Sequence, residues 1–182
     1  MKANSSSVIN LPECFRYPPF FKVNQLSVKA DLSLTFKDSI VREPFIYDIL
    51  LYNGYDAAKP WQNSGIFVPI LLEEWKKEEQ VLTACFKERR GKGNEELMTS
   101  SISFFIIFIC WANDQPVETL ESHLTWLEQK KVKPVNVKER LRFIIENPTQ
   151  FHSFIQLQQL FQELAKHFIK KEALKKINKK NP

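Results

Sequence analysis

Glycine is nearly absent from this chain, with only four glycines among 182 residues. A glycine lets the backbone approach a phosphate closely or turn through positive φ, so its scarcity argues against most nucleotide-cradling loops. The sequence also lacks a phosphate-binding loop, a Gly-x-Ser-x-Gly element and a His-x-x-x-His pair. These familiar signatures of enzymatic chemistry are therefore missing, and the glycine-poor composition favours a protein built of packed helices.

Cysteine is also scarce. Cys14, Cys85 and Cys110 are odd in number, widely spaced and set among apolar residues, which suits a reducing cytoplasm better than a disulfide framework. Because no Cys-x-x-Cys pair exists, these cysteines do not predict a zinc site. The N-terminus shows no apolar stretch of signal-peptide length, and we therefore predict a cytoplasmic protein.

Long apolar runs are missing too. The most apolar stretch, residues 102–112, is roughly half of the ~20 residues that a membrane-spanning helix needs. It is apolar nearly all round a helix, which predicts a buried helix at the centre of a bundle. With 43% apolar and 26% charged residues, the composition fits one compact domain with a substantial core.

Proline and aromatic residues, by contrast, crowd the N-terminal segment. Residues 1–24 contain Pro12, Pro18 and Pro19 among aromatic side chains, which predicts an extended arm lying on the body of the protein. Residues 26–36 then alternate apolar and mostly polar side chains, the period of a half-buried strand. A lone strand is unstable, so this one pairs with the arm, joins a strand of another subunit, or is really a loop and a helix start.

Helical spacing of apolar residues governs the rest of the chain. Asn53-Gly54 has the form of a helix C-terminus, Asn94 that of an N-cap, and the segment 136–139 that of a capping box. The predicted helices span residues 44–53, about 69–90, 94–112, 114–132, 136–146 and 148–177. The last would be about 45 Å long, so its lysine-rich end projects or frays.

We therefore predict an all-α fold, a single-domain bundle of about five or six helices with an extended N-terminal arm. Residues 1–37 would form the arm, with or without one strand. Residues 38–168 would form the helical core domain, and residues 169–182 a lysine-rich C-terminal tail that continues the last helix.

Two neighbouring segments in the C-terminal half are distinctive. They read Lys133-Pro134-Val135-Asn136-Val137-Lys138-Glu139-Arg140-Leu141 and Phe151-His152-Ser153-Phe154-Ile155-Gln156-Leu157. Together they resemble the YpoC-like family of Bacillus and relatives, with weaker similarity upstream at residues 43–47. The resemblance implies a cytoplasmic protein. It carries over no activity and no catalytic residues, because the family has none assigned.

The histidines form no metal-binding or catalytic constellation. A di-iron bundle needs Glu-x-x-His pairs, but Leu120, Thr149 and Leu164 stand three positions before the three histidines. His152 and Ser153, at the corner before the last helix, are the polar site that we single out, although bonding to the corner backbone competes with a catalytic role. We predict no cofactor, no metal site and no catalytic residues.

Two basic segments are candidate contacts for anions or nucleic acid. One is a loop that feeds the N-terminus of the helix at 94–112, where free amides and the helix dipole favour an anion. An ordinary mobile loop is the alternative, because Glu95 and Glu96 already place negative charge in the first turn. The other is the tail, where seven lysines and one acid between residues 166 and 180 give +6 and leave −1 for the rest of the chain. Such a tail suits nucleic acid, an anionic membrane or a solvated helix end. The candidate residues are Arg89, Arg90, Lys92, Lys170, Lys171, Lys175, Lys176, Lys179 and Lys180.

From these patterns we predict a non-enzymatic interaction or adaptor protein that meets another protein through the arm, a helical face or the tail. The alternative is weak, sequence-independent binding of nucleic acid or an anionic surface through the basic tail. An enzyme ranks third, because the sequence presents no set of acid, base, nucleophile or metal ligands. A protein partner would remain bound at high salt, whereas nucleic acid would be released.

Overall fold

A computed structural model describes residues 6–88, 94–121 and 123–180 of the chain. Within these ranges it contains six α-helices, a two-stranded sheet and three 3-10 turns. The helices and strands are β1 (Ser6–Asn10), β2 (Ser27–Asp31), α1 (Phe36–Arg42), α2 (Ile46–Tyr52), α3 (Ser64–Lys87), α4 (Glu95–Trp111), α5 (Val137–Glu146) and α6 (Phe151–Lys180). This mostly helical fold confirms the predicted class, with the arm folded into a small hairpin.

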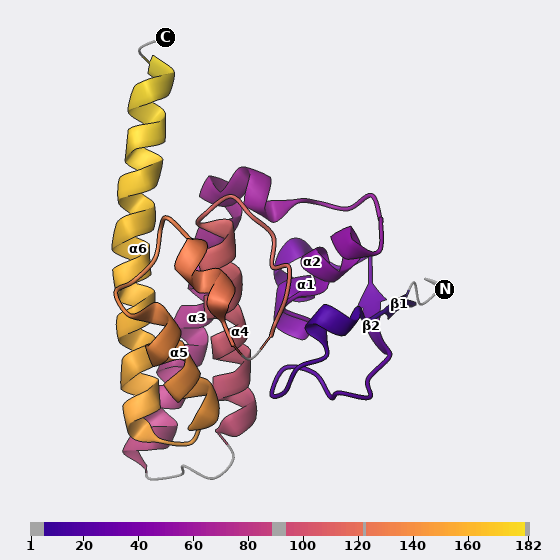
Figure 1. Ribbon diagram of the computed structural model, residues 1–182, viewed down its shortest axis with the longest axis horizontal. Helices are drawn as coiled ribbons and strands as arrows, with labels where there is room; N and C mark the ends of the chain where they lie inside the picture. The colour runs from indigo at the N-terminus through magenta and orange to yellow at the C-terminus, as the bar shows by residue number, and fades with distance from the viewer. Residues whose placement is uncertain (1–5, 89–93, 122, 181–182) are drawn as a thin grey trace.

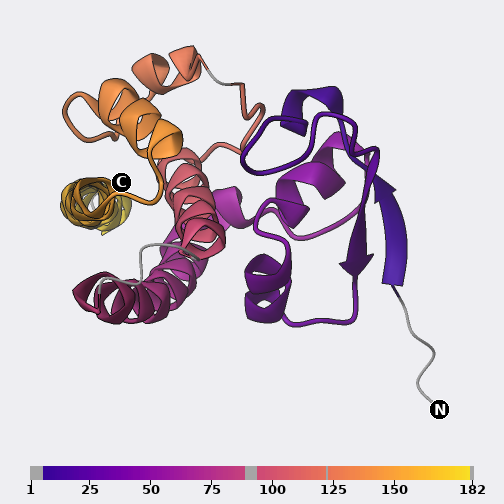
Figure 2. The ribbon, with the colours of Figure 1, turned by 90° about the horizontal axis from the view of Figure 1, so that it is seen from below.

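Helix α4 lies at the centre because its C-terminal three turns have no exposed face. Every residue from Ser101 to Trp111 is buried, as the apolar run predicts. Its buried hydroxyls find partners: Ser103 donates to the carbonyl of Thr99 at 2.9 Å and Ser101 to the carboxylate of Glu78 on α3 at 2.5 Å. The hairpin, α1 and α2 cover one side of α4, and α3, α5 and α6 cover the other (Figures 1 and 2).

Aromatic side chains join α6 to the bundle. Trp75 of α3 stacks on Phe161 of α6, with ring centroids 4.1 Å apart and ring planes within 6°. Phe161 also lies 5.3 Å from Phe105 and 6.2 Å from Phe108, both on α4. One phenylalanine therefore contacts two other helices. With 30 residues, α6 is about 45 Å long, and its C-terminal end projects beyond the other helices (Figure 1).

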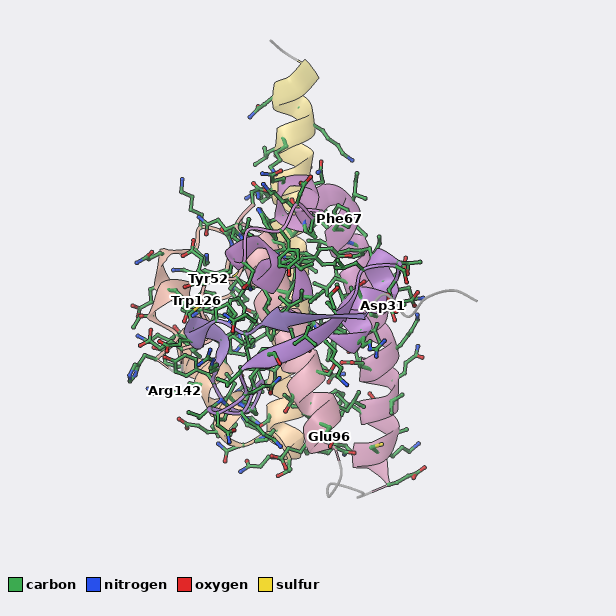
Figure 3. All side chains as sticks on the ribbon, turned by 90° about the vertical axis from the view of Figure 1, so that its right-hand side faces the viewer. Asp31, Tyr52, Phe67, Glu96, Trp126 and Arg142 are labelled. Atoms are coloured by element: carbon green, nitrogen blue, oxygen red, sulfur yellow. The ribbon has the colours of Figure 1, made fainter. Side chains whose placement is uncertain are left out.

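The alternating segment pairs with the arm, which was one of the three alternatives for residues 26–36. Strands β1 and β2 are antiparallel, with Ser7 opposite Ala30 and Ile9 opposite Val28. Val28 and Ala30 are buried, as the alternation predicts. The hairpin crosses in front of the helices when the molecule is viewed from its side (Figure 3).

The predicted strand is too long at its C-terminal end. The observed strand β2 stops at Asp31, and Phe36 begins α1 instead of continuing the strand. The cause is a helix cap, because Thr35 Oγ1 accepts a hydrogen bond from the amide of Asp38 at 3.2 Å.

The prediction of a helix over residues 114–132 is wrong. Within this segment the structure has only a 3-10 turn, Thr125–Gln129, in its described part. Backbone amides that a helix would use internally bond to distant groups instead. The Val117 N–H donates to the Asp48 carboxylate at 2.7 Å, and the Leu120 N–H donates to the Cys14 carbonyl at 2.8 Å. Tertiary hydrogen bonds thus override the helical spacing of the apolar residues.

Details of three predicted helices also need correction. Helix α3 begins at Ser64, so that Pro69 lies inside the helix, and its predicted end at residue 90 falls outside the described residues. Helix α5 has the predicted bounds, but Asn136 adopts φ 51° and makes no side-chain cap, so the capping box is absent. Helix α6 starts at Phe151 because the residues before it form a turn, closed by the amide of Gln150.

The stacked position of Phe161 predicts a large loss of stability on truncation. Phe161→Ala should lower the free energy of unfolding by about 3–5 kcal/mol, because it removes a buried ring between three helices. Phe151→Ala, on the same helix but 59% exposed, is the matched control and should change it by less than about 1.5 kcal/mol. Urea unfolding followed by circular dichroism measures both. Equal losses for the two variants would contradict the packing described.

Candidate functional site

The structure describes the two basic segments singled out from the sequence only in part. The candidate side chains outside the described part are Arg89, Arg90, Lys92, Lys179 and Lys180. Just before the loop, Phe86 of α3 packs against the first turn of α6, with its ring 5.8 Å from that of Phe151. The tail is the opposite end of α6, so most of the length of a helix of about 45 Å separates it from this contact.

Two tail lysines are held by an internal carboxylate. Lys171 and Lys175 donate to Asp114 at 2.6 and 2.9 Å, and Lys171 also donates to the carbonyl of Ala112 at 2.6 Å. Ser64, at the start of α3, donates to the same carboxylate at 2.9 Å. We call Ser64, Asp114, Lys171 and Lys175 the Asp114 cluster. It attaches α6 to the start of α3 and to the turn after α4.

Electrostatics at the Asp114 cluster follow from burial and pairing. Burial acts to raise the pKa of Asp114, but hydrogen bonds from both lysines and Ser64 outweigh it and hold that pKa below its ordinary value. Burial lowers the pKa of Lys171, despite the neighbouring carboxylate. For Lys175, pairing with Asp114 and Glu172 outweighs burial and raises the pKa. Part of the positive charge of the tail is thus neutralised within the molecule.

Of the remaining described side chains of the tail, Glu172 is partly buried and the others face solvent. Lys170 and Lys176 are exposed and have no ion pair among the described residues. Ile169, Leu174 and Ile177 are exposed by 67%, 52% and 55%. At about 100° per residue these five positions share one side of α6, and we call them the α6 outward face.

His152 and Ser153 occupy different environments. His152 is exposed, with its ring edge-to-face on Phe143 at 5.7 Å and its Nε2 3.2 Å from the Gln156 amide nitrogen. Ser153 is fully buried, and its hydroxyl has no hydrogen-bond partner in the described structure. The two side chains therefore do not face a common space. Across the described ranges, no group of three or more metal-ligating side chains comes together.

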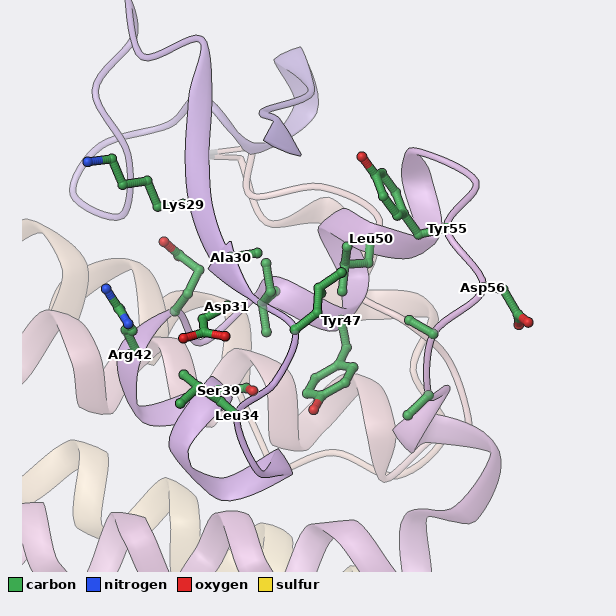
Figure 4. Close-up of a pocket in the computed structure, with 15 residues that line it drawn as sticks. Lys29, Ala30, Asp31, Leu34, Ser39, Arg42, Tyr47, Leu50, Tyr55 and Asp56 are labelled. Carbon is green, nitrogen blue, oxygen red and sulfur yellow. The ribbon is translucent and has the colours of Figure 1, made fainter. Parts of the chain in front are cut away.

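A pocket that the sequence does not mark lies between β2, α1, α2 and the loop at residues 55–58 (Figure 4). It encloses about 270 Å³, and we call it the hairpin pocket. Its charged and phenolic lining side chains are Lys29, Asp31, Arg42, Glu43, Tyr47, Tyr55 and Asp56. Its apolar walls include Leu34, Ile46 and Leu50.

Glu43 is the unusual group of the hairpin pocket. It is partly buried at the C-terminus of α1, and its carboxylate has no partner among the described residues. Burial raises the pKa of Glu43 to about 7. Asp31 differs, because the hydroxyl and amide of Ser33 donate to it at 2.6 and 3.1 Å and hold its pKa below the ordinary value.

A second unusual carboxyl group, that of Asp48 on α2, is buried in the core. It is 1% exposed and accepts the Val117 amide, which joins α2 to the segment after α4. Burial raises its pKa to about 7, although that amide and the nearby Trp111 indole favour the charged form. The indole does not reach hydrogen-bond geometry, and both the Trp111 Nε1 and the Asp48 Oδ2 are buried without a partner in the described structure.

Sequence reasoning missed Glu43, Asp48 and Asp114. A signal was available for Asp48, a single acid inside the apolar run 45–51, because charged residues are rarely buried without a reason. Nothing in the sequence links Asp114 to lysines 57 and 61 residues further on, since only the docking of α6 brings them together.

These features define the class of this protein: a helical bundle around a central helix that is buried from Ser101 to Trp111, with an N-terminal hairpin and a projecting C-terminal helix. The chain belongs to the YpoC-like protein family, whose sequence model matches residues 66–176. This confirms the resemblance noted in the C-terminal half. The matched region runs from the start of α3 into the last turns of α6 and leaves the hairpin, α1 and α2 outside.

A curated relative extends this similarity. The chain is 35% identical over 146 residues to a Bacillus subtilis (strain 168) protein named "Uncharacterized protein YpoC", covering 78% of this chain and 85% of the relative. That name states no activity. No solved structure matches the chain significantly. Within the described ranges, none of the helices has the length and apolar character needed to span a bilayer.

The Asp114 cluster predicts that the end of α6 loosens when its carboxylate is neutralised. Asp114→Asn keeps a side chain that tolerates the φ of 57° at this position but removes the charge that both lysines contact. Because the pairs are partly exposed, the unfolding free energy should fall by only about 0.5–1.5 kcal/mol. Amide hydrogen exchange should accelerate in the last turns of α6 and stay unchanged in α5. Unchanged exchange in α6, or an equal effect of the control Asp56→Asn, would contradict the attachment.

Asp48 predicts a pH dependence of stability. Its pKa is about 7 in the folded protein and ordinarily 3.8, so the folded state holds this proton more tightly. The contribution of Asp48 to the free energy of unfolding is fully present below about pH 4 and is lost as the pH rises to about 7. Asp48→Asn keeps the acceptor for Val117 and removes the titration.

Between pH 5 and 7.5, the stability of Asp48→Asn relative to the unmodified protein should therefore rise by about 2 kcal/mol. Urea unfolding at each pH measures this difference, and effects of other titrating groups cancel in it. Glu118→Gln, an exposed acid beside Val117, is the control and should show no such trend. A flat difference for Asp48→Asn would show that this carboxyl does not titrate in that window.

Proposed function

We propose that this protein is a non-enzymatic cytoplasmic interaction protein that binds an acidic protein partner through the α6 outward face. The supporting observation is the combination found on that face. Three large aliphatic side chains are more than half exposed beside two lysines that have no ion pair among the described residues. A helix face of this kind fits an apolar groove with carboxylates on its rim.

The aliphatic residues favour a protein over nucleic acid. Phosphates bind lysine and arginine, and bases stack on aromatic or planar side chains, but neither interacts favourably with Ile169, Leu174 or Ile177. The Asp114 cluster weakens the nucleic-acid alternative further, because it already pairs two of the tail lysines. Fewer unpaired charges mean fewer phosphate contacts and weaker non-specific binding.

An enzymatic role receives no support from the candidate polar residues. His152 is exposed on one side of the corner, whereas the Ser153 hydroxyl is enclosed in the core. A catalytic pair must lie within hydrogen-bond reach of each other and of a substrate. We therefore assign neither residue a catalytic role.

The proposal is tested by affinity capture with the full-length protein from a lysate of cells that produce it, after nuclease treatment and at about 0.5 M salt. Two double variants disrupt the face, Ile169→Ser/Ile177→Ser and Lys170→Glu/Lys176→Glu. Matched controls are Ile66→Ser, 64% exposed on α3, and Lys76→Glu, an exposed lysine on the same helix. A specific partner should be captured by the unmodified protein and the controls, and reduced at least about tenfold by both double variants. Purified partner and protein should then reproduce this order of affinities.

Two direct binding measurements separate the competing surfaces. One measures binding of a labelled DNA oligonucleotide, and the other measures binding of vesicles that contain anionic lipid. The proposal would be overturned if no partner is captured at high salt and the protein binds either the vesicles or the oligonucleotide, the latter only below moderate salt. Equal capture by all variants would also overturn it. Point variants are preferable to a truncation after His167, which would also remove buried Phe168 and the Lys171 contact to Asp114.

A further inference from the structure

The hairpin pocket has the composition of a small-molecule site, separate from the α6 outward face. Its walls come from four segments of the chain, and Figure 4 shows the labelled Tyr47, Leu50 and Tyr55 on one side and Lys29, Asp31 and Arg42 on the other. A volume of about 270 Å³ can hold a small organic molecule. Apolar walls with a few polar groups are the usual lining of such sites.

The polar groups of this pocket are not equivalent. Asp31 already accepts two hydrogen bonds from Ser33 on its Oδ1, and Lys29, Arg42 and Asp56 are exposed to solvent. Glu43 alone combines partial burial with an unpaired carboxylate. A desolvated, unpaired carboxylate gains most from a ligand that is positively charged and donates hydrogen bonds.

We propose that the hairpin pocket binds a small organic amine, with its ammonium group on the Glu43 carboxylate and its apolar body against Leu34, Ile46 and Leu50. Tyr47 adds an aromatic face beside this apolar wall. The acidic side chains of the lining exceed the basic ones by three to two, which favours a cation over an anion.

An anionic ligand is the natural competitor, since Lys29 and Arg42 also line the pocket. Both side chains are exposed and retain their hydration, so an anion on them would gain little from the enclosed part of the pocket. The raised pKa of Glu43 supports the same preference, because an adjacent cation removes part of the penalty for ionising this carboxyl in a buried site.

The test uses isobutylamine, 2-phenylethylamine and tryptamine as amines of rising size, with 2-phenylethanol and 3-phenylpropionate as neutral and anionic analogues. Binding to the full chain is followed by NMR at pH 8, where Glu43 is ionised and amines with a pKa of about 10 remain charged. At least one amine should bind about tenfold more tightly than the neutral analogue. The shifted amides should include Ala30, Ala57 and Ala58, which line the pocket.

Variants then assign the contact. Glu43→Gln, which keeps the shape of the side chain, should weaken amine binding at least about tenfold and leave 2-phenylethanol unaffected. Glu73→Gln, an exposed glutamate on α3, is the matched control and should bind as the unmodified protein does.

Several results would overturn the assignment. These are no binding of any amine at about 10 mM, tighter binding of 3-phenylpropionate, and equal affinity of Glu43→Gln. Glu43 also borders a second hollow beside Phe20, Phe21 and Thr99. Chemical-shift changes confined to that hollow would place the ligand outside the hairpin pocket and would equally overturn the proposal.

Discussion

The fold depends on the burial of α4 from every side. An ordinary surface helix needs cover on one stripe, but the residues from Ser101 to Trp111 leave no side that water can contact. Burying apolar surface contributes about 25 cal/mol per Å², so any exposed side of this helix would reduce stability substantially. Two groups of elements are therefore required, and each is held by its own contact with the same helix. The hairpin, α1 and α2 are part of the core for this reason, although they precede the region that the family model matches.

Elements set by local sequence signals could be predicted, whereas elements set by contacts between distant residues could not. The bounds of α4 and α5 were predictable because apolar spacing is a local signal, although neither Asn94 nor Asn136 makes the side-chain cap expected of it. Pairing of β2 with the arm was one of three open alternatives, since the sequence shows the alternation but not the partner strand. The helix expected at residues 114–132 failed because Asp48 and Cys14, far away in the chain, take the amides of Val117 and Leu120.

The candidate sites show the same limit. The lysines of the tail were visible as a composition, but their division into paired and unpaired members depends on Asp114, which periodicity placed at a helix start that does not exist. The hairpin pocket was not predictable, because its walls come from segments between residues 29 and 58 that carry no shared motif. Burial changes the character of Glu43 and Asp48, and burial is a property of the folded chain alone.

The position of the Asp114 cluster also bears on how the molecule folds and unfolds in time. Its contacts join residues 50 to 61 positions apart, so they form only after α3 and α4 have assembled and α6 has docked. Contacts that form after the transition state for folding act mainly on the rate of unfolding. The cluster thus lengthens the lifetime of the docked helix without hastening its formation. Where cleavage is faster than reclosing, that lifetime sets how often the end of α6 becomes accessible to proteases.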